Sequence, residues 1–129
     1  MRLRQTVLDA TDPRGLAEFW REVLGWRYRS GDADSGPRPE WVVLRHPDGG
    51  PGLAFQRVEQ LTRATWPDGT VPQQIHLDLT VEDVAELDAE HDRLLALRAE
   101  LLLDRSDDPE EPLRVYADPE GHPFCVFVA

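Results

Sequence analysis

The sequence contains an internal repeat of about half its own length, and this repeat constrains the fold more than any other feature. Gln5 and His76 each stand seven positions before an acidic residue, Asp12 or Asp83, that begins a helix-like run. The offset is the same for both pairs, because 76 minus 5 and 83 minus 12 both give 71. Such a repeat indicates a duplicated module folded against its copy. The seam between two such modules is a natural place for a ligand.

The first half of the chain has the pattern of a strand, a helix and three further strands. Asp12 is the expected N-cap of the helix, Pro13 its first residue and Gly25 its C-terminal cap. The apolar residues of the helix recur at helical spacing. Strands are expected at residues 6–10, 26–29, 40–45 and 53–58, and a polar loop at residues 31–39.

The second half repeats this order. A helix is expected to begin at Asp83, with an apolar stripe that comprises Val84, Leu87, Leu94, Leu95 and Leu101. Strands are expected at residues 74–80, 101–103, 113–117 and 124–128, and a solvated acidic loop at residues 104–111. The prediction is an α+β fold of two tandem βαβββ modules. They form a single domain over residues 1–129, with module one at 1–60, a linker at 61–73 and module two at 74–129.

Composition excludes several classes of partner. The net charge of −11 and a pI near 4.6 argue against binding to nucleic acid and to anionic membrane surfaces. No apolar run approaches the roughly 20 residues of a membrane span, and the N-terminus has no apolar signal region, so we expect a cytoplasmic protein. A single cysteine, Cys125, excludes an intrachain disulfide.

Three segments together resemble one known superfamily. The segments are LDATDPRGLAEFWREVLGW, QIHLDLTVEDV and YADPEGHPFCVF. The chain resembles the vicinal oxygen chelate superfamily over nearly its whole length, and within it the glyoxalase-like domains related to glyoxalase and bleomycin-resistance proteins. The resemblance implies two βαβββ modules whose curved mixed sheets enclose a cavity. It also implies that homodimers are common. The superfamily includes metal-dependent isomerases, dioxygenases and transferases as well as metal-free binding proteins, so fold alone does not choose a function.

The resemblance also implies where a metal would bind. Metal-using relatives take four ligands, two of them carboxylates, from matching strands of the two modules. The first-strand positions correspond here to Gln5 and His76, which are both acceptable ligand types. The carboxylate positions correspond to Cys125 in module two and to Leu53 in module one, or with a shifted alignment to Phe55 or Gln56.

The carboxylate ligands are therefore missing from the expected strands. Neither residues 53–58 nor residues 124–128 include Asp or Glu. We accordingly predict no metal cofactor. The alternative is an atypical divalent site, with Zn²⁺ suited to the imidazole of His76 and the thiol of Cys125. Each residue also has a purely structural explanation, because a free cysteine is usually a core residue and a histidine often has a hydrogen-bond partner in the core.

The remaining candidates are polar or aromatic. Asp78 stands two positions after His76, so both side chains should share one face of a strand and could transfer a proton together. The alternative is a polar pair at the rim of the cavity. Trp41, Trp66 and Tyr116 are candidates for the wall of a small-molecule pocket.

We therefore predict a metal-independent binder of a small organic molecule in the cavity between the modules. The predicted ligand-binding residues are Gln5, Trp41, Gln56, Trp66, His76, Asp78, Tyr116 and Cys125. The first alternative is a lyase or isomerase-type enzyme that uses His76 with an atypical metal or as half of an acid–base pair. The second is a small domain that dimerises or binds a partner protein.

Overall fold

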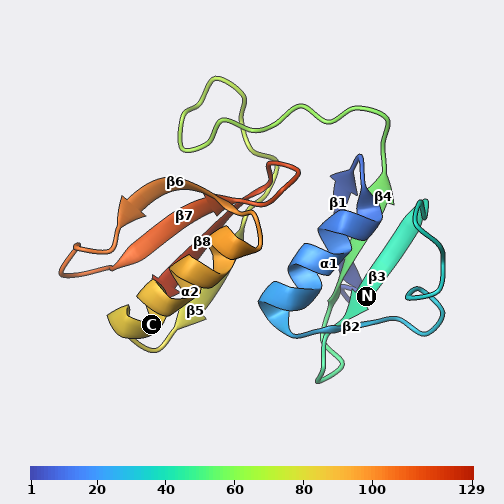
Figure 1. Ribbon diagram of the computed structural model, residues 1–129, viewed down its shortest axis with the longest axis horizontal. Coiled ribbons are helices and arrows are strands. Elements are labelled where there is room, and N and C mark those ends of the chain that lie inside the picture. The colour runs from blue at the N-terminus through green and yellow to red at the C-terminus, as the bar shows by residue number, and fades with distance from the viewer. The chain divides into compact units, whose positions relative to one another are not determined.

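The computed structural model describes all 129 residues, and the chain divides into two compact units, Met1–Thr62 and Arg63–Ala129. Each unit contains one helix and one four-stranded sheet with both parallel and antiparallel pairs, as Figure 1 shows. The predicted α+β fold of two tandem βαβββ modules is thus confirmed. Neither sheet closes on itself. No helix of the chain is long and apolar enough to cross a membrane.

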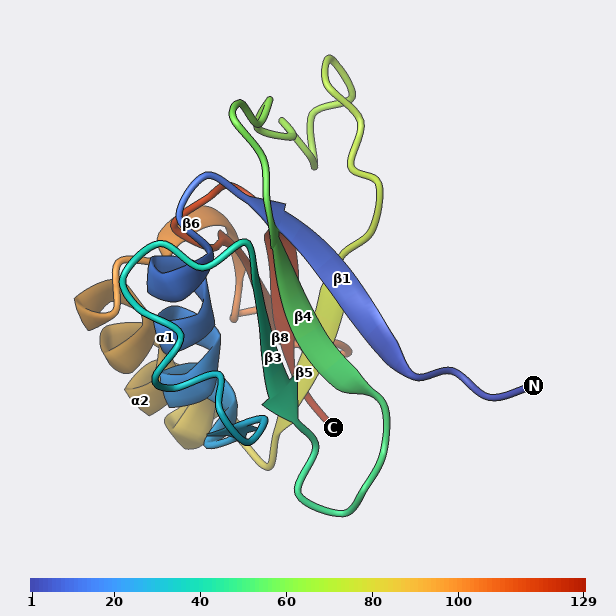
Figure 2. The same cartoon turned by 90° about the vertical axis from the view of Figure 1, so that its right-hand side faces the viewer.

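The first module is built from strand β1, helix α1 and three further strands. The elements are β1 (Gln5–Ala10), α1 (Pro13–Leu24), β2 (Arg27–Tyr28), β3 (Trp41–Arg45) and β4 (Gly52–Arg57). The sheet has the order β1-β4-β3-β2, with β1 parallel to β4 and the other pairs antiparallel. Helix α1 packs on β3 and β4, and Figure 2 shows it on one face of this sheet.

The ends of α1 are set by local sequence, as predicted. The Asp12 carboxylate accepts a hydrogen bond from the backbone N–H of Gly15 at 3.0 Å, and Pro13 is the first helical residue. Gly25 ends the helix in the left-handed conformation, with φ of 67°, and its N–H donates to the Arg21 carbonyl. Within the helix Trp20 is fully buried and forms part of the core of the module.

The second module repeats this plan with a differently bounded first strand. The elements are β5 (Leu77–Val81), α2 (Val84–Ala96), β6 (Glu100–Arg105), β7 (Leu113–Ala117) and β8 (Pro123–Val128). The sheet has the order β5-β8-β7-β6, and β5 runs parallel to β8. Strand β5 begins three residues later than predicted, so His76 directly precedes it. Strand β6 is longer than predicted and contains a register shift at Leu101 and Leu103.

The predicted apolar stripe of α2 is wrong in three of its five residues. Leu87 and Leu94 are buried, but Val84 and Leu95 are 42% and 43% exposed, and Leu101 belongs to β6. The helix packs on β5 and β8 along a narrower line than the stripe that we predicted. Polar contacts of the same helix complete its attachment to the sheet.

Arg114 is the main polar attachment between α2 and β7. Its side chain is 8% exposed, and its guanidinium donates to the Leu87 carbonyl at 3.1 Å and to the Asp88 carboxylate at 2.8 Å. It also donates to Asp104 of the neighbouring strand β6 at 3.0 Å, and to the hydroxyl of Ser106, just after β6, at 3.0 Å. Every donor contact of this buried cation is thus to an oxygen of α2, of β6 or of the loop that follows β6.

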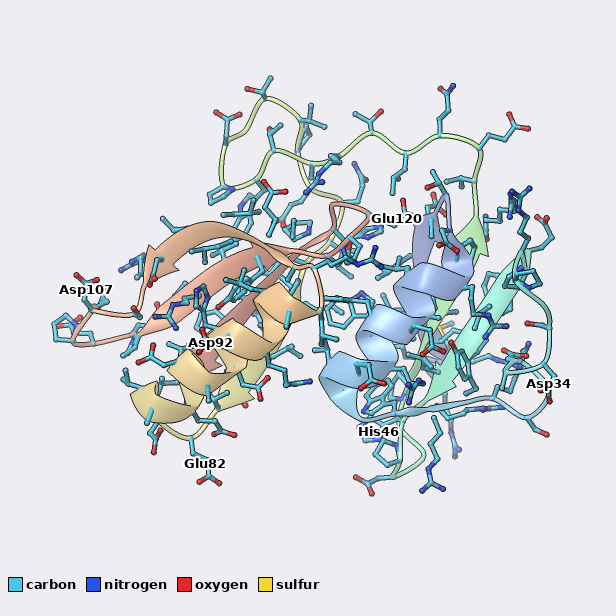
Figure 3. The ribbon with its side chains drawn as sticks, in the orientation of Figure 1. Asp34, His46, Glu82, Asp92, Asp107 and Glu120 are labelled. Atoms are coloured by element: carbon cyan, nitrogen blue, oxygen red, sulfur yellow. The ribbon has the colours of Figure 1, made fainter.

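The solvated acidic loop was predicted at residues 104–111, but Asp104 and Arg105 belong to β6, so the loop is shorter than predicted and begins after Arg105. Figure 3 shows Asp107 at the tip of the connection between β6 and β7, and Asp108 in the same connection accepts hydrogen bonds from the N–H groups of Glu110 and Glu111. The carboxylates of this loop therefore stabilise its own turn.

Candidate functional site

The second sheet carries different chemistry on its two faces. Arg114 and Tyr116 contact α2, so alternate residues of β7 face the helix. Val115 and Leu113 lie on the opposite face, where they form an apolar cluster with Cys125 of β8. Asp78 is the register partner of Cys125 across the parallel β5–β8 pair, and register partners share a face. The face opposite α2 is the candidate functional face.

Three predicted site residues meet on this face. The imidazole nitrogens of His76, the carboxylate of Asp78 and the sulfur of Cys125 offer one donor atom each, and these three atoms all lie within 4.8 Å of one another. The His76 Nε2 atom is 3.2 Å from an Asp78 carboxylate oxygen. The side chains of His76 and Asp78 are 30% and 56% exposed, whereas Cys125 is buried. The cluster is therefore accessible to solvent at His76 and Asp78 and shielded from solvent at Cys125.

A fourth residue, which sequence analysis assigned only to the linker, orients the histidine. The side-chain oxygen of Gln73 lies 2.9 Å from His76 Nδ1. An amide oxygen only accepts hydrogen bonds, so Nδ1 is the donor of this bond and Nε2 is left facing Asp78. No sequence pattern pointed to Gln73, because it lies in an irregular segment and its contact depends on how that segment folds back.

Trp66 covers the histidine on its other side. The indole stacks on the His76 ring with centroids 4.9 Å apart and planes 13° apart. Trp66 also packs against the apolar cluster of Leu113, Val115 and Cys125. The prediction placed Trp66 at a pocket wall, and the structure places it beside the polar cluster.

The loop that carries Trp66 is held by its own hydrogen bonds. Thr65 and Val71 are joined by a backbone bond of 2.9 Å, and the Thr65 hydroxyl accepts from the Val71 N–H at 2.8 Å. Arg63, just before this loop, forms an ion pair of 2.7 Å with Glu100 of β6. Trp66 therefore lies in a loop that is closed by its own hydrogen bonds and attached at its start to β6.

The remaining predicted residue of this module lies on the other face. Tyr116 is fully buried, its ring stacks on Phe124 and its hydroxyl is 2.9 Å from His91 Nδ1 of α2. Burial raises the pKa of the Tyr116 phenol to about 12. Because the Tyr116 hydroxyl contacts His91 of α2, on the face away from His76, Tyr116 is not part of the candidate site. Alternation in β7 could not show from sequence which of its two faces the helix would cover.

The first module holds the other three predicted residues on one face of its sheet. Trp41 and Gln56 are register partners of β3 and β4, and Gln5 lies opposite Gly52 on the β1–β4 ladder. Strand alternation gives these three residues the same face. Gln5 is four positions along β1 from Asp9, the partner of Gln56, so the two glutamines are far apart on the ladder. Two open pockets of about 390 and 430 Å³ in this module are lined by other residues.

The environment of Cys125 changes the acidity of its thiol. Burial, together with the charge of Asp78 and a hydrogen bond to it, raises the pKa of the Cys125 thiol to about 11. The folded pKa exceeds that of a free thiol, which is about 8.5. The resulting contribution to stability is therefore present below about pH 8.5 and is lost as the pH rises through 11.

We expect alkylation of Cys125 by iodoacetamide to be slow in the native protein. At pH 8 the thiolate fraction is lower than that of a free thiol by a factor of at least roughly 100. The rate should still be rising between about pH 9 and 10.5, whereas a rate that levels off by pH 9 contradicts the assignment. The chain has one cysteine, so mass spectrometry follows a single reaction, and the urea-unfolded protein is the control. Asp78→Asn should accelerate the native reaction.

Comparison with known proteins gives the family. The model of the glyoxalase-like domain family matches residues 5–127. No curated protein matches the sequence. Among solved structures, the chain is similar to a glyoxalase/bleomycin resistance protein/dioxygenase family enzyme from Burkholderia phytofirmans, at 17% identity and a TM-score of 0.73, with 98% of each chain covered.

Two fosfomycin resistance proteins named FosX show the same fold. The one from Mesorhizobium loti is 15% identical with a TM-score of 0.69, covering 98% of this chain and 91% of its own. The one from Listeria monocytogenes is 16% identical with a TM-score of 0.70, covering 98% and 89%, and is described in complex with Mn(II) and 1S,2S-dihydroxypropylphosphonic acid. With a family model matched over nearly its whole length, the chain belongs to the glyoxalase-like domain family.

Proposed function

We propose that this protein binds a small planar organic molecule on the face of the second sheet that lies opposite α2. The observation that carries the proposal is the stack of Trp66 on His76 beside the Asp78 carboxylate. An aromatic wall next to a few convergent polar groups is what small-molecule sites need. The fosfomycin resistance protein from Listeria monocytogenes, described in complex with a small phosphonic acid, supports the binding of a small molecule by this fold.

The proposal assigns separate tasks to the two parts of the site. Trp66 would contact the flat body of the ligand, while the buried cluster of Leu113, Val115 and Cys125 would support the indole from behind. His76 and Asp78 would contact the polar end of the ligand. The sequence predicted a metal-independent binder, and contact with the indole, which needs no metal ion, is consistent with that prediction.

Equilibrium dialysis with 2-naphthol in the presence of EDTA tests this proposal. We expect saturable binding of one molecule per chain, with a Kd on the order of 0.1 mM for a ligand of this size. The phenol 2-naphthol is neutral at pH 7, so the net charge of the protein does not repel it. Binding of 2-naphthol that does not saturate, or that is equally strong after the protein is unfolded in urea, would contradict the proposal.

The 3.2 Å contact between His76 and Asp78 supports a second candidate, an enzyme of the lyase or isomerase type. A carboxylate beside an imidazole is suited to moving a proton from a carbon next to a carbonyl group. Exchange of solvent deuterium into hydroxyacetone, followed by NMR with EDTA present, should then be faster with the protein than without it. Loss of this acceleration in His76→Gln is required by the hypothesis.

A further inference from the structure

The parallel pairing of β5 with β8 adds Asp78 to His76 and Cys125, the two residues that the sequence offered for an atypical divalent site. Asp78 and Cys125 are direct register partners, and His76 lies two positions before Asp78 on the same face. The carboxylate that residues 124–128 lack is supplied by the neighbouring strand. All three donors belong to one module. This set differs from the one implied by family resemblance, which takes ligands from both modules and has no counterpart of Asp78.

The spacing of the donor atoms fits a tetrahedral ion. Ligands about 2.0 to 2.3 Å from a zinc ion are roughly 3.3 to 3.8 Å apart in a tetrahedron. The His76 and Asp78 atoms are 3.2 Å apart, and all three donor atoms are within 4.8 Å of one another. Shifts of about 1 Å, within the reach of side-chain rotation at a partly exposed site, would bring all three to these distances.

The hydrogen bond from His76 to Gln73 orients the ring for such an ion. Nδ1 donates to the amide oxygen, which leaves Nε2 facing the Asp78 carboxylate. A nitrogen and a carboxylate oxygen 3.2 Å apart can share either a proton or a metal ion. A histidine whose second nitrogen donates to a carbonyl oxygen is the usual arrangement of a metal ligand.

The chemistry of the donors selects the metal. A thiolate, an imidazole and a carboxylate together prefer Zn²⁺ or Co²⁺ over Mn²⁺, which favours oxygen ligands. One thiolate and one carboxylate would balance the two positive charges of the ion. With three protein residues on the ion, the fourth coordination position would be open on the exposed side. An oxygen of the bound small molecule could occupy it, as substrate does in catalytic zinc sites.

We propose that His76, Asp78 and Cys125 form a three-ligand site for Zn²⁺, with Gln73 positioning the histidine and the fourth position open to an oxygen of the bound molecule. This inference deepens the proposed function, because the ion would hold the polar end of the molecule that Trp66 stacks on. It specifies the ligand class as an aromatic molecule with a carboxylate or phenol oxygen next to the ring.

Titration of the metal-free protein with Co²⁺ and Zn²⁺ tests the donor set. We expect one Co²⁺ per chain with a thiolate-to-cobalt charge-transfer band in the near ultraviolet, displaced by Zn²⁺. Affinity for Mn²⁺ should be at least about 100-fold weaker than for Zn²⁺. Cys125→Ser should abolish the band and weaken Zn²⁺ binding at least 100-fold. Gln73→Leu should weaken it about 10-fold, as loss of an outer hydrogen bond to a ligand does.

The matched control is a second histidine–aspartate pair in the same module. His122 and Asp118 are 2.9 Å apart but have no thiol beside them, so His122→Gln should leave Zn²⁺ affinity unchanged. Asp78→Asn keeps the shape of an exposed side chain and should weaken binding 10- to 100-fold. Circular dichroism of each metal-free variant establishes that it is folded before the titration.

The absence of 1:1 binding in the wild type overturns the inference, and so does a charge-transfer band that survives Cys125→Ser. Binding that depends on His76 but is unaffected by Asp78→Asn overturns the donor set. A second arm separates the inference from the proposed function. If 2-naphthol binds in EDTA but Zn²⁺ does not bind, the metal site alone fails. If Zn²⁺ binds and neither 2-naphthol nor 3-hydroxy-2-naphthoate does, the proposed function fails.

Discussion

Replacing Arg114 by methionine is expected to lower the free energy of unfolding by about 3 kcal/mol. A hydrogen bond to a charged group contributes about 1.5 to 3 kcal/mol, and Arg114 makes two such bonds, to Asp88 and Asp104. Both carboxylates are partly exposed, at 61% and 42% of their side chains, so water replaces part of the loss. Methionine fills a similar volume, which keeps the effect of a cavity small.

Urea denaturation followed by circular dichroism measures this loss at pH 7. Arg21→Met is the matched control, because Arg21 also forms ion pairs but lies on the exposed side of α1, and it should change the free energy by less than about 0.5 kcal/mol. A loss below 1 kcal/mol for Arg114→Met would show that the polar attachment of α2 contributes little.

The same network predicts how stability depends on acid. Hydrogen bonds from the hydroxyl and the N–H of Ser106, followed by the charge and hydrogen bond of Arg114, lower the pKa of Asp104 to about 2. A depressed folded pKa stabilises the protein above the ordinary pKa of aspartate and loses that contribution as the pH falls toward 2. Wild type should therefore lose stability between about pH 4 and 2, and Arg114→Met should lose less over this interval, since part of the shift has already gone.

Local signals in the sequence were sufficient for the fold. The Asp12 and Pro13 start and the Gly25 end of α1 depend on neighbours within a few residues, and the predicted boundaries are confirmed. The βαβββ order of elements along each half of the chain followed from the repeat, whereas the order of the strands within each sheet was not predicted. The stripe of α2 was wrong at Val84 and Leu95, because periodicity shows which residues share a side of a helix but not how much of that side the sheet covers.

The candidate site could be predicted only in part. His76, Asp78, Cys125 and Trp66 were all singled out, but their proximity depends on two long-range features. One is the register of β5 against β8, which places Asp78 beside Cys125. The other is the fold of the segment before β5, which brings Gln73 and Trp66 to His76. Neither feature leaves a periodic signal in the sequence, because both depend on contacts between segments rather than within them.

Replacing Trp66 by alanine is expected to weaken 2-naphthol binding about 30-fold. A ligand that stacks on a partly buried indole removes on the order of 80 Å² of apolar surface of the indole and the ligand from water, which corresponds to about 2 kcal/mol. Each 1.4 kcal/mol is a factor of about ten in Kd. Equilibrium dialysis in EDTA measures the change, and Trp66→Phe, which keeps a ring at this position, should recover most of the affinity.

The matched control is Trp41→Ala in the first module. Trp41 is also a partly buried tryptophan and was predicted to contact the ligand, but its sheet holds no cluster of three metal-ligating groups like that of His76, Asp78 and Cys125. If the site is the Trp66 and His76 face, Trp41→Ala leaves Kd within about twofold. A loss that is larger for Trp41→Ala than for Trp66→Ala would move the binding site to the first sheet, where Gln56 is the register partner of Trp41. The pair of variants thus decides which module recognises the ring.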